Sequence, residues 1–217
     1  MGAATQLQGI IFDLDGTLGN TLPVCYAAFR HAFQVFLNRY YSDDEITSLF
    51  GPSEEGIIKR LVPSQWQACV KTYHEEYEKA HLICDKPFPG IKQTLNLCKQ
   101  KNVGVAIVTG KGEISAAISL RYLGIKDYFD EVIPGSPERG IKPLAIQSVL
   151  AKWNLLPQHV AYVGDSPYDM QAAKEAGVIP LAAAWAETAN FERLKEMDPT
   201  AIFSTVDGLT NWIDNTQ

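Results

Sequence analysis

The sequence predicts an α/β protein in which helices cover both faces of a parallel β-sheet and a group of helices is inserted near the N-terminus. Apolar runs rich in β-branched residues recur along the chain and alternate with helical patterns, as in a parallel sheet covered on both faces. Residues 20–85 have helical patterns but no clear strand. Polar residues directly follow three of the apolar runs, which is where open α/β sheets bind their ligands.

The elements of the sheet follow one another in a regular order. The first strand is expected at residues 7–13, and the alternating pattern returns after Pro87. Residues 188–200 are weakly patterned, so no element is assigned to them. After Pro87 we expect strands at residues 103–108, 131–133, 160–163, 178–182 and 202–203, and helices at residues 91–101, 113–123, 143–153, 167–176 and 206–214.

The inserted region is predicted to hold four helices. Apolar residues recur at intervals of three and four along residues 22–40, which indicates one long amphipathic helix. Ser42 and Glu45 form a capping-box pattern that opens a second helix. A third helix follows, and Ser64 with Gln67 is expected to cap a fourth.

The chain is therefore expected to divide into two units. Residues 1–19 and 86–217 form a Rossmann-like α/β core, and residues 20–85 form a helical cap. The insertion follows the carboxyl end of the first strand, so the cap should lie over the edge of the sheet where ligands bind.

Length and composition exclude several classes of function. A chain of 217 residues with a net charge of −6 is not expected to bind nucleic acid or a membrane surface in general. The first six residues lack the pattern of a signal peptide, and no apolar run has the length of a membrane span, so a cytoplasmic location is expected. The cysteines form no CxxC pair and are expected to be buried free thiols: Cys25, Cys69, Cys84 and Cys98.

The first strand ends at two closely spaced carboxylates. Asp13 and Asp15 come directly after the apolar run Ile10-Ile11-Phe12, and alternation along a strand can turn both toward one side. Two acids held together resist joint ionisation, so the pair indicates a bound cation, a shared proton, or separate acid and nucleophile roles. A strand that simply ends in a polar turn is the alternative for this segment alone.

Two further strands end in polar motifs. Thr109-Gly110-Lys111 follows the strand that ends at Val108, and a segment with Asp165 and Asp169 follows the strand that ends at Val163. Lys142 stands between these motifs, at the start of a helical pattern. The carboxyl ends of these strands should bring the acids, a hydroxyl, turn amides and a lysine to one crevice.

The four motifs, in this order, resemble those of the haloacid dehalogenase superfamily, and most closely its phosphatases with a helical cap of the first type, similar to phosphoglycolate phosphatase and pyrophosphatase-like members. The resemblance implies Mg²⁺-dependent hydrolysis of small phosphate monoesters through an aspartyl-phosphate. It makes Asp13 the nucleophile and a metal ligand. Asp15 becomes the general acid and base, with its backbone carbonyl on the metal, and members that dehalogenate lack this second aspartate.

The resemblance also assigns roles to the other motif residues. Asp165 would complete the Mg²⁺ site, while Asp169 would support it from the outer shell through Lys142 or a metal-bound water. For Asp165 the alternative is a plain helix cap, and for Lys142 and Asp169 it is a solvated side chain. Lys142 would neutralise the nucleophile and the phosphoryl oxygens, which would be held by the Leu14 amide, Thr109 and Gly110, whereas Lys111 is a weaker candidate that is as well explained as a surface lysine.

The sequence leaves the substrate open beyond a small phosphorylated metabolite. Ser53, Lys59 and Arg60 in the cap are candidates for contact with the leaving group, with solvent exposure as the alternative for each. A phosphomutase of the same chemistry and a non-catalytic phosphate-binding or regulatory protein on this fold are the alternative functions. The run Gly19-Asn20-Thr21 departs from the family's usual apolar residue, acid and Ser or Thr, with little expected effect on the chemistry.

Overall fold

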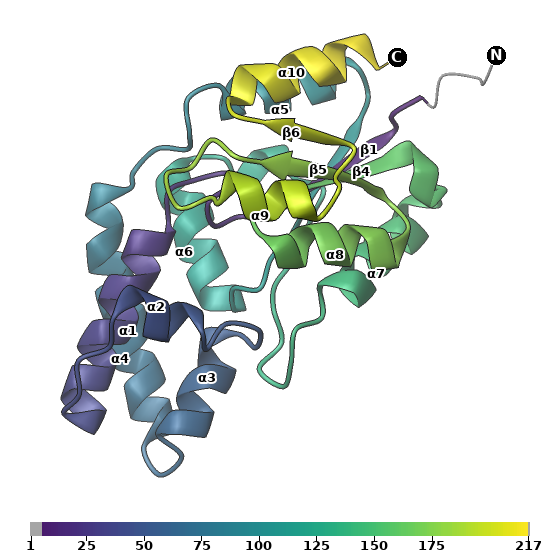
Figure 1. The fold of residues 1–217 in the computed structure, drawn as a ribbon. Coiled ribbons are helices and arrows are strands. Elements are labelled where there is room, and N and C mark those ends of the chain that lie inside the picture. Colours follow the sequence, from purple (N-terminus) through teal and green to yellow (C-terminus); the bar gives the residue numbers. More distant parts are fainter. Residues whose placement is uncertain (1–5, 217) are drawn as a thin grey trace.

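A computed structural model describes residues 6–216 of the chain. The expectation that no signal peptide is present falls almost wholly on residues 1–5, which lie outside the described part. The protein has a six-stranded sheet in which all strands pair in parallel, in the order β3-β2-β1-β4-β5-β6 (Figure 1). The strands are β1 (Gly9–Phe12), β2 (Gly104–Val108), β3 (Glu131–Ile133), β4 (Val160–Gly164), β5 (Ile179–Ala183) and β6 (Ala201–Phe203).

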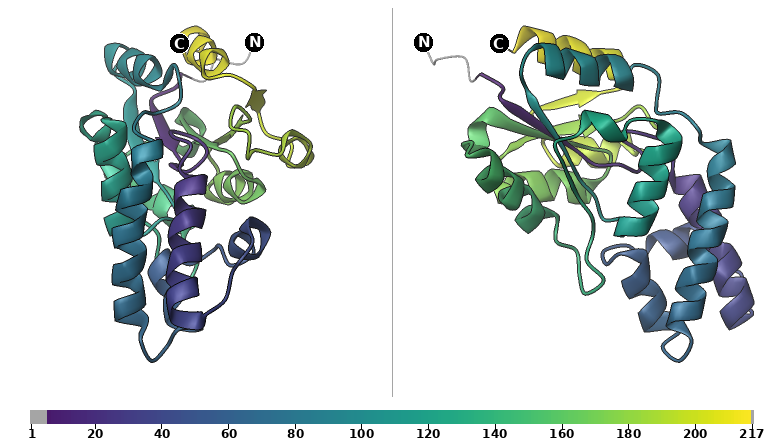
Figure 2. Two further views of the ribbon diagram at one scale, coloured as in Figure 1. Left: turned by 90° about the vertical axis from the view of Figure 1, so that its left-hand side faces the viewer. Right: turned by 180° about the vertical axis from the view of Figure 1, so that it is seen from behind.

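Helices cover the sheet on both faces, as predicted (Figure 2). Alternation along β1 explains the two layers: Ile10 and Phe12 point into one apolar cluster, and Ile11 points into the other. The first cluster includes residues of α5 (Ile91–Gln100), α6 (Glu113–Leu123) and α10 (Val206–Asn215), and the second includes residues of α7 (Lys142–Trp153) and α8 (Pro167–Ala176).

The helical insertion lies between β1 and α5. It comprises α1 (Leu22–Leu37), α2 (Asp43–Thr47), α3 (Glu54–Leu61), α4 (Trp66–Ala80) and the short 3₁₀ helix η1 (His81–Ile83). Packing between α1 and α4 forms its centre, where the rings of Phe29 and Tyr73 have centroids 4.6 Å apart. The Ser119 hydroxyl of the core helix α6 forms hydrogen bonds with the Tyr77 hydroxyl at 2.7 Å and with His81 Nε2 at 2.9 Å. These two bonds join the cap to the core.

Of the two helix caps predicted within the insertion, one is present and the other is not. The capping box of Ser42 and Glu45 is present at α2. The prediction that the Ser64 side chain caps the start of α4 is wrong, because this helix begins after Gln65 and has no side-chain cap. Ser64 lies inside the tight turn after α3 that is closed by the hydrogen bond from Gln65 N–H to the Val62 carbonyl at 3.2 Å, so its hydroxyl is not at the helix start.

The weakly patterned stretch of residues 188–200 contains one short helix. This helix, α9 (Phe191–Glu196), is capped by the Asn190 side chain, which accepts a hydrogen bond from the Arg193 N–H at 3.1 Å. The expected edge strand and closing helix are present as β6 and α10. All four cysteines are buried free thiols, as predicted.

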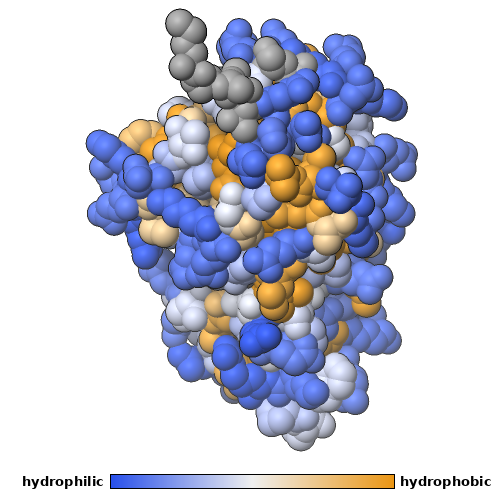
Figure 3. All heavy atoms as spheres, turned by 90° about the vertical axis from the view of Figure 1, so that its right-hand side faces the viewer, coloured by the Kyte–Doolittle hydropathy of each residue, from blue (hydrophilic) through white to orange (hydrophobic). Residues whose placement is uncertain are grey.

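The surface of the protein is mainly hydrophilic. On the face shown in Figure 3, hydrophilic side chains predominate, and apolar side chains gather in a band between them. Within residues 6–216, no helix combines the length and the apolar character that crossing a membrane requires.

Candidate active site

A cavity of about 750 Å³ lies between the cap and the carboxyl ends of the central strands. The core supplies residues that follow β1, β2 and β4, together with the first residue of α7. These are the positions at which the sequence predicted a shared crevice. The core residues predicted for the site that line the cavity are Asp13, Asp15, Thr109, Gly110, Lys142 and Asp165.

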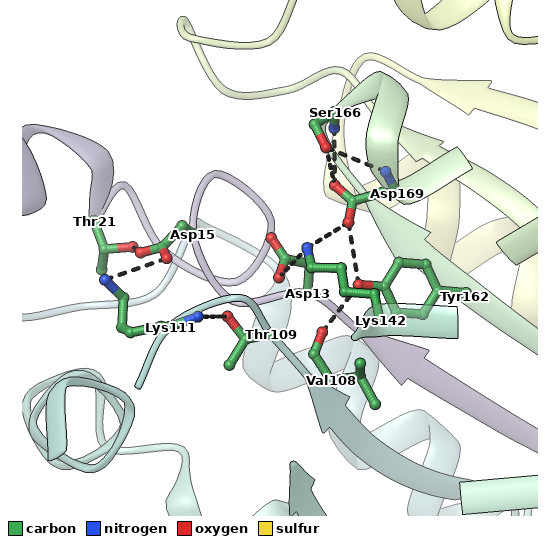
Figure 4. Close-up of polar contacts among 10 residues, drawn as sticks. All are labelled: Asp13, Asp15, Thr21, Val108, Thr109, Lys111, Lys142, Tyr162, Ser166 and Asp169. Atoms are coloured by element: carbon green, nitrogen blue, oxygen red, sulfur yellow. Dashed lines mark hydrogen bonds and ion pairs between the residues drawn. The ribbon is translucent and has the colours of Figure 1, made fainter. Parts of the chain in front are cut away.

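Asp13 is held at the centre of the sheet edge. Its N–H donates to the Val163 carbonyl at 2.8 Å, which extends the pairing of β1 with β4 by one residue. Its carboxylate Oδ1 accepts a hydrogen bond from Lys142 Nζ at 2.9 Å (Figure 4). Burial raises the pKa of Asp13 to about 7 because the positive charge of Lys142 offsets desolvation only in part, while Asp169 and Asp15 raise the pKa further.

Lys142 bridges two buried carboxylates. Its Nζ also donates to Asp169 Oδ1 at 2.6 Å, and both side chains are almost completely buried. Burial lowers the pKa of Lys142, but the charges of Asp13 and Asp169 outweigh that effect and raise it well above its ordinary value. The alternative of a solvated side chain is therefore wrong for Lys142 and for Asp169.

Asp169 is fixed from several directions. It stands in the first turn of α8, where its Oδ2 accepts the Ser166 N–H at 3.0 Å and completes a capping box with that residue. The Tyr162 hydroxyl lies 2.9 Å from the Val108 carbonyl oxygen and 3.1 Å from Asp169 Oδ1. Because both of its oxygens are engaged, Asp169 orients Lys142 rather than facing the cavity itself.

Asp15 has a cationic partner of its own. Lys111 Nζ lies 3.3 Å from Asp15 Oδ2 and 4.5 Å from the centre of the Tyr77 ring, and the Lys111 side chain is only 2% exposed. Thr21, at the start of the cap, donates a hydrogen bond to Asp15 Oδ1. The two aspartates thus line one cavity but pair with different lysines, Asp13 with Lys142 and Asp15 with Lys111.

The buried position of Lys111 corrects the interpretation of this residue as a surface lysine. Burial lowers its pKa, but Asp15 and other neighbours outweigh that effect and raise the pKa well above its ordinary value. Its place directly after Thr109-Gly110, at the end of a central strand, was the available signal. The Lys111 N–H donates to Thr109 Oγ1 at 3.2 Å, which keeps this turn compact.

Three carboxylates converge beside the turn that follows β1. Oxygen atoms of Asp13, Asp165 and Asp169 lie within 4.8 Å of one another. Burial and the charges of Asp169 and Asp13 raise the pKa of Asp165 well above its ordinary value. The helix cap at this position is Ser166, so the alternative of a plain helix cap does not apply to Asp165.

The carboxylate cluster fits a hard divalent cation. Its donors are all oxygens, and the raised pKa values of Asp13 and Asp165 show that their negative charge is incompletely compensated. Gly16 has a φ of +72°, and a Cβ there would lie 2.0 Å from Asp165 Oδ2, so the turn can approach this carboxylate only with glycine. Asp13 and Asp165 are the acids available to a metal, because Asp169 is fully engaged.

The cap contributes Glu54, which was not among the individual residues predicted to contact the substrate although its loop was expected to reach toward the site. Glu54 is 4% exposed, lines the cavity, and accepts the Gly112 N–H of the core at 2.8 Å. Burial raises its pKa, but contact with His74 and the charge of Lys111 outweigh that effect and hold the pKa at about 2. Glu54 therefore remains an anion and ties α3 to the start of α6.

The cap residues proposed from the sequence as substrate contacts do not line the cavity. Ser53 is buried, and its hydroxyl donates to Glu55 at 2.6 Å. Lys59 is exposed, with its Nζ 5.5 Å from the centre of the Trp66 ring. Arg60 is also exposed on α3. Leu14 is buried, so any contact with a phosphoryl oxygen would come from its backbone amide.

Comparison with protein families identifies the family of the chain. Residues 10–183 match the model of the haloacid dehalogenase-like hydrolases. The chain belongs to this family. The resemblance drawn from the four motifs is thus confirmed, and so is the class of enzyme, a hydrolase.

Relatives of this haloacid dehalogenase-like hydrolase carry the names of phosphatases. Pyrophosphatase PpaX of Halalkalibacterium halodurans is 24% identical and aligns over 94% of this chain and 95% of its own. Phosphoglycolate phosphatase of Aquifex aeolicus is 26% identical over 96% of this chain and 98% of its own. This protein is therefore similar to phosphatases over nearly the whole length of its chain.

Solved structures confirm the fold of this family member. A predicted phosphoglycolate phosphatase from Haemophilus somnus superposes with a TM-score of 0.77 at 25% identity, over 99% of this chain and 100% of that one. A hydrolase from Pseudomonas syringae superposes with a TM-score of 0.79 at 20% identity, over 95% and 98% of the two chains. At that lower identity the likeness concerns the fold alone.

Proposed function

We propose that this protein is a Mg²⁺-dependent phosphatase that hydrolyses small phosphate monoesters through an aspartyl-phosphate. The observation that carries the proposal is the placement of Asp13 and Asp15 in one cavity, each with its own lysine. A carboxylate that acts as a nucleophile and a second carboxylate that handles protons need separate environments, and the two lysines provide them.

The reaction would proceed in two steps. A carboxylate oxygen of Asp13 forms a bond to phosphorus while the bond from phosphorus to the leaving oxygen breaks, and Asp15 donates its proton to that oxygen. Asp15 then takes a proton from water as the water oxygen attacks phosphorus. The bond between phosphorus and Asp13 breaks, which releases inorganic phosphate and restores both carboxylates to their starting states.

The remaining site residues would hold the phosphoryl group. The backbone amides of Leu14 and Gly110 and the hydroxyl of Thr109 stand at strand ends that border the cavity, where they would donate to the phosphoryl oxygens. Lys142 would compensate the negative charge of the nucleophile and of these oxygens. Asp169 supports this role through the hydrogen bond by which it positions Lys142.

Asp13, Asp165 and the backbone carbonyl of Asp15 would hold the Mg²⁺ ion. When bound, the ion supplies positive charge that polarises the phosphoryl group.

We propose that residues 1–19 and 86–217 form the core and that residues 20–85 form the cap. We place the activity in the cytoplasm, where buried free thiols such as those of this chain stay reduced.

Phosphate release from a panel of phosphate monoesters tests the proposal, with Mg²⁺ or with EDTA, for the wild-type protein and Asp13→Asn. We expect release that needs Mg²⁺ and that is abolished in Asp13→Asn, whose folding is checked by circular dichroism. Near-normal turnover by Asp13→Asn would refute the assignment of the nucleophile. Transfer of phosphate to a sugar phosphate, without release, would instead favour a phosphomutase, and binding without either reaction would favour a non-catalytic protein.

A further inference from the structure

The wall that the cap presents to the cavity is apolar. Among the described residues of the cap that line the cavity, the one charged side chain is Glu54, which is an anion. The others offer hydrocarbon, ring, thiol or hydroxyl groups. Those with apolar side chains include Leu22, Cys25, Tyr26, Phe29, Phe50 and Ile57.

The two lysines that line the cavity form ion pairs with acids of the core. Lys142 is paired with Asp13 and Asp169, and Lys111 is paired with Asp15. The remaining cation among the described lining residues is Arg193, which is exposed on the core helix α9. A leaving group that carried its own negative charge would therefore meet hydrocarbon and Glu54 at the cap, where burying an unpaired charge is costly.

Two aromatic rings border this part of the cavity. Tyr26 on α1 and Phe50 after α2 have ring planes within 7° of parallel and centroids 6.3 Å apart. Phe50 is 39% exposed although its ring is large and apolar, so the cavity contains aromatic surface that a ligand can cover. The Tyr26 hydroxyl lies 3.0 Å from Thr47 Oγ1, and this pair adds one polar contact at the same wall.

We propose that the leaving group of the substrate is an uncharged alcohol that carries a ring, and that this ring packs on Tyr26 and Phe50. The inference rests on the proposed phosphatase function and names its class of substrate. In the first step the bond from phosphorus to the alcohol oxygen breaks, and the proton of Asp15 makes the product a neutral alcohol. Pyrophosphate and phosphoglycolate, whose leaving groups are anions, are accordingly poor substrates.

The size of the cavity supports this class. A volume of about 750 Å³ lies in the range of sites that enclose drug-sized ligands. The phosphoryl group would occupy the end beside Asp13, which leaves most of the space to the leaving group. A small anion such as glycolate would leave the apolar wall uncovered.

Three esters with the same kind of leaving oxygen test the inference. Ethyl phosphate, benzyl phosphate and para-carboxybenzyl phosphate all release a primary alcohol, so the chemistry at phosphorus is matched. We expect kcat/KM for benzyl phosphate to exceed that for ethyl phosphate by about tenfold or more, because the ring buries apolar surface on the cap. The added carboxylate should lower kcat/KM about tenfold or more relative to benzyl phosphate.

Variants of Phe50 test whether the preference for a leaving group with a ring depends on the apolar wall of the cap. Phe50→Ala should reduce the ratio of the benzyl to the ethyl value of kcat/KM about tenfold. Phe50→Arg should raise the ratio of the para-carboxybenzyl to the benzyl value, because it places a cation on the wall. Val35→Ala is the matched control: Val35 lies on the same helix as Tyr26, is 57% exposed and does not line the cavity, so both ratios should stay as in the wild type.

The possible outcomes separate this inference from the phosphatase function. Faster hydrolysis of para-carboxybenzyl phosphate, phosphoglycolate or pyrophosphate than of benzyl phosphate would overturn the inference, leave the phosphatase function intact and point to Arg193 as an anion-binding residue. Equal ratios in wild type and Phe50→Ala would also overturn it. Release of phosphate from none of these compounds, with Mg²⁺ and folded protein, would overturn the phosphatase function and the inference with it.

Discussion

The burial of Asp13, together with the acids around it, predicts that its charge destabilises the metal-free fold. The pKa of Asp13 rises from 3.8 to about 7 in the folded protein. Between these pH values the folded state keeps a proton that the unfolded state has lost, so the free energy of unfolding falls as the pH rises through this window. Asp13→Asn removes the charge but keeps an oxygen that can accept the hydrogen bond from Lys142.

The size of the effect follows from the pKa difference. The step from 3.8 to about 7 corresponds to about 4 kcal/mol when the window is crossed completely, since each pKa unit is worth about 1.4 kcal/mol. Asp13→Asn should therefore be more stable than the wild type at about pH 8 by up to about 4 kcal/mol. At about pH 5 the advantage should shrink by roughly 2–3 kcal/mol, because Asp13 is then largely protonated in the folded state.

Urea unfolding, followed by tryptophan fluorescence in EDTA, measures the free energy of unfolding of the wild type and of Asp13→Asn at about pH 5 and at about pH 8. The difference between wild type and Asp13→Asn reports the charge of Asp13 together with its effect on the neighbouring Asp165, whose pKa that charge helps to raise. A difference that does not change between the two pH values would refute the reasoning. Addition of Mg²⁺ at the higher pH should stabilise the wild type more than Asp13→Asn, because the ion binds the folded state and needs this carboxylate.

Three further predictions concern positioning, the cap and the metal. Asp169→Asn removes the charge that orients Lys142, and should lower kcat about tenfold to a hundredfold with a small change in KM, as steady-state kinetics will measure. Gly56→Ala places a Cβ 1.9 Å from the Pro137 carbonyl oxygen, and should lower kcat/KM through displacement of the cap, whereas Gly208→Ala, which meets only ordinary contacts, should not. Replacing Mg²⁺ with Ca²⁺ should inhibit phosphate release, since the larger ion takes more ligands and can engage both Asp13 oxygens; full activity in Ca²⁺ alone would contradict the metal assignment.

The sequence was sufficient to predict the sheet and the core half of the site. Asp13, Thr109 and Asp165 directly follow apolar runs, and the strands that precede them are neighbours in the sheet, with β1 between β2 and β4. Their convergence therefore follows from parallel pairing alone. Lys142 was expected in the same crevice because it stands between the motifs, but a solvated side chain was the alternative, and its burial became clear only in the structure.

The contacts between cap and core could not be read from the sequence. Glu54 meets the Gly112 amide across a separation of 58 residues, and no local pattern encodes how α3 docks on the start of α6. The burial of Lys111 depends on Asp15 and on Tyr77 of the cap, so its place after Thr109-Gly110 indicates a residue near the site but not a buried one. The helix α9 was missed because six residues are too few to establish a helical period.

The two connections of the cap meet where they leave the core. The Phe88 N–H donates to the Leu18 carbonyl at 3.0 Å, so the insertion starts and ends at adjacent points of the backbone. To the sheet, the whole cap is therefore equivalent to one long loop. A lineage that exchanges this loop, or an engineer who grafts another in its place, can alter which ligands the cavity admits, while the pairing of β1 with β2 and β4, and with it the position of Asp13, stays as it is.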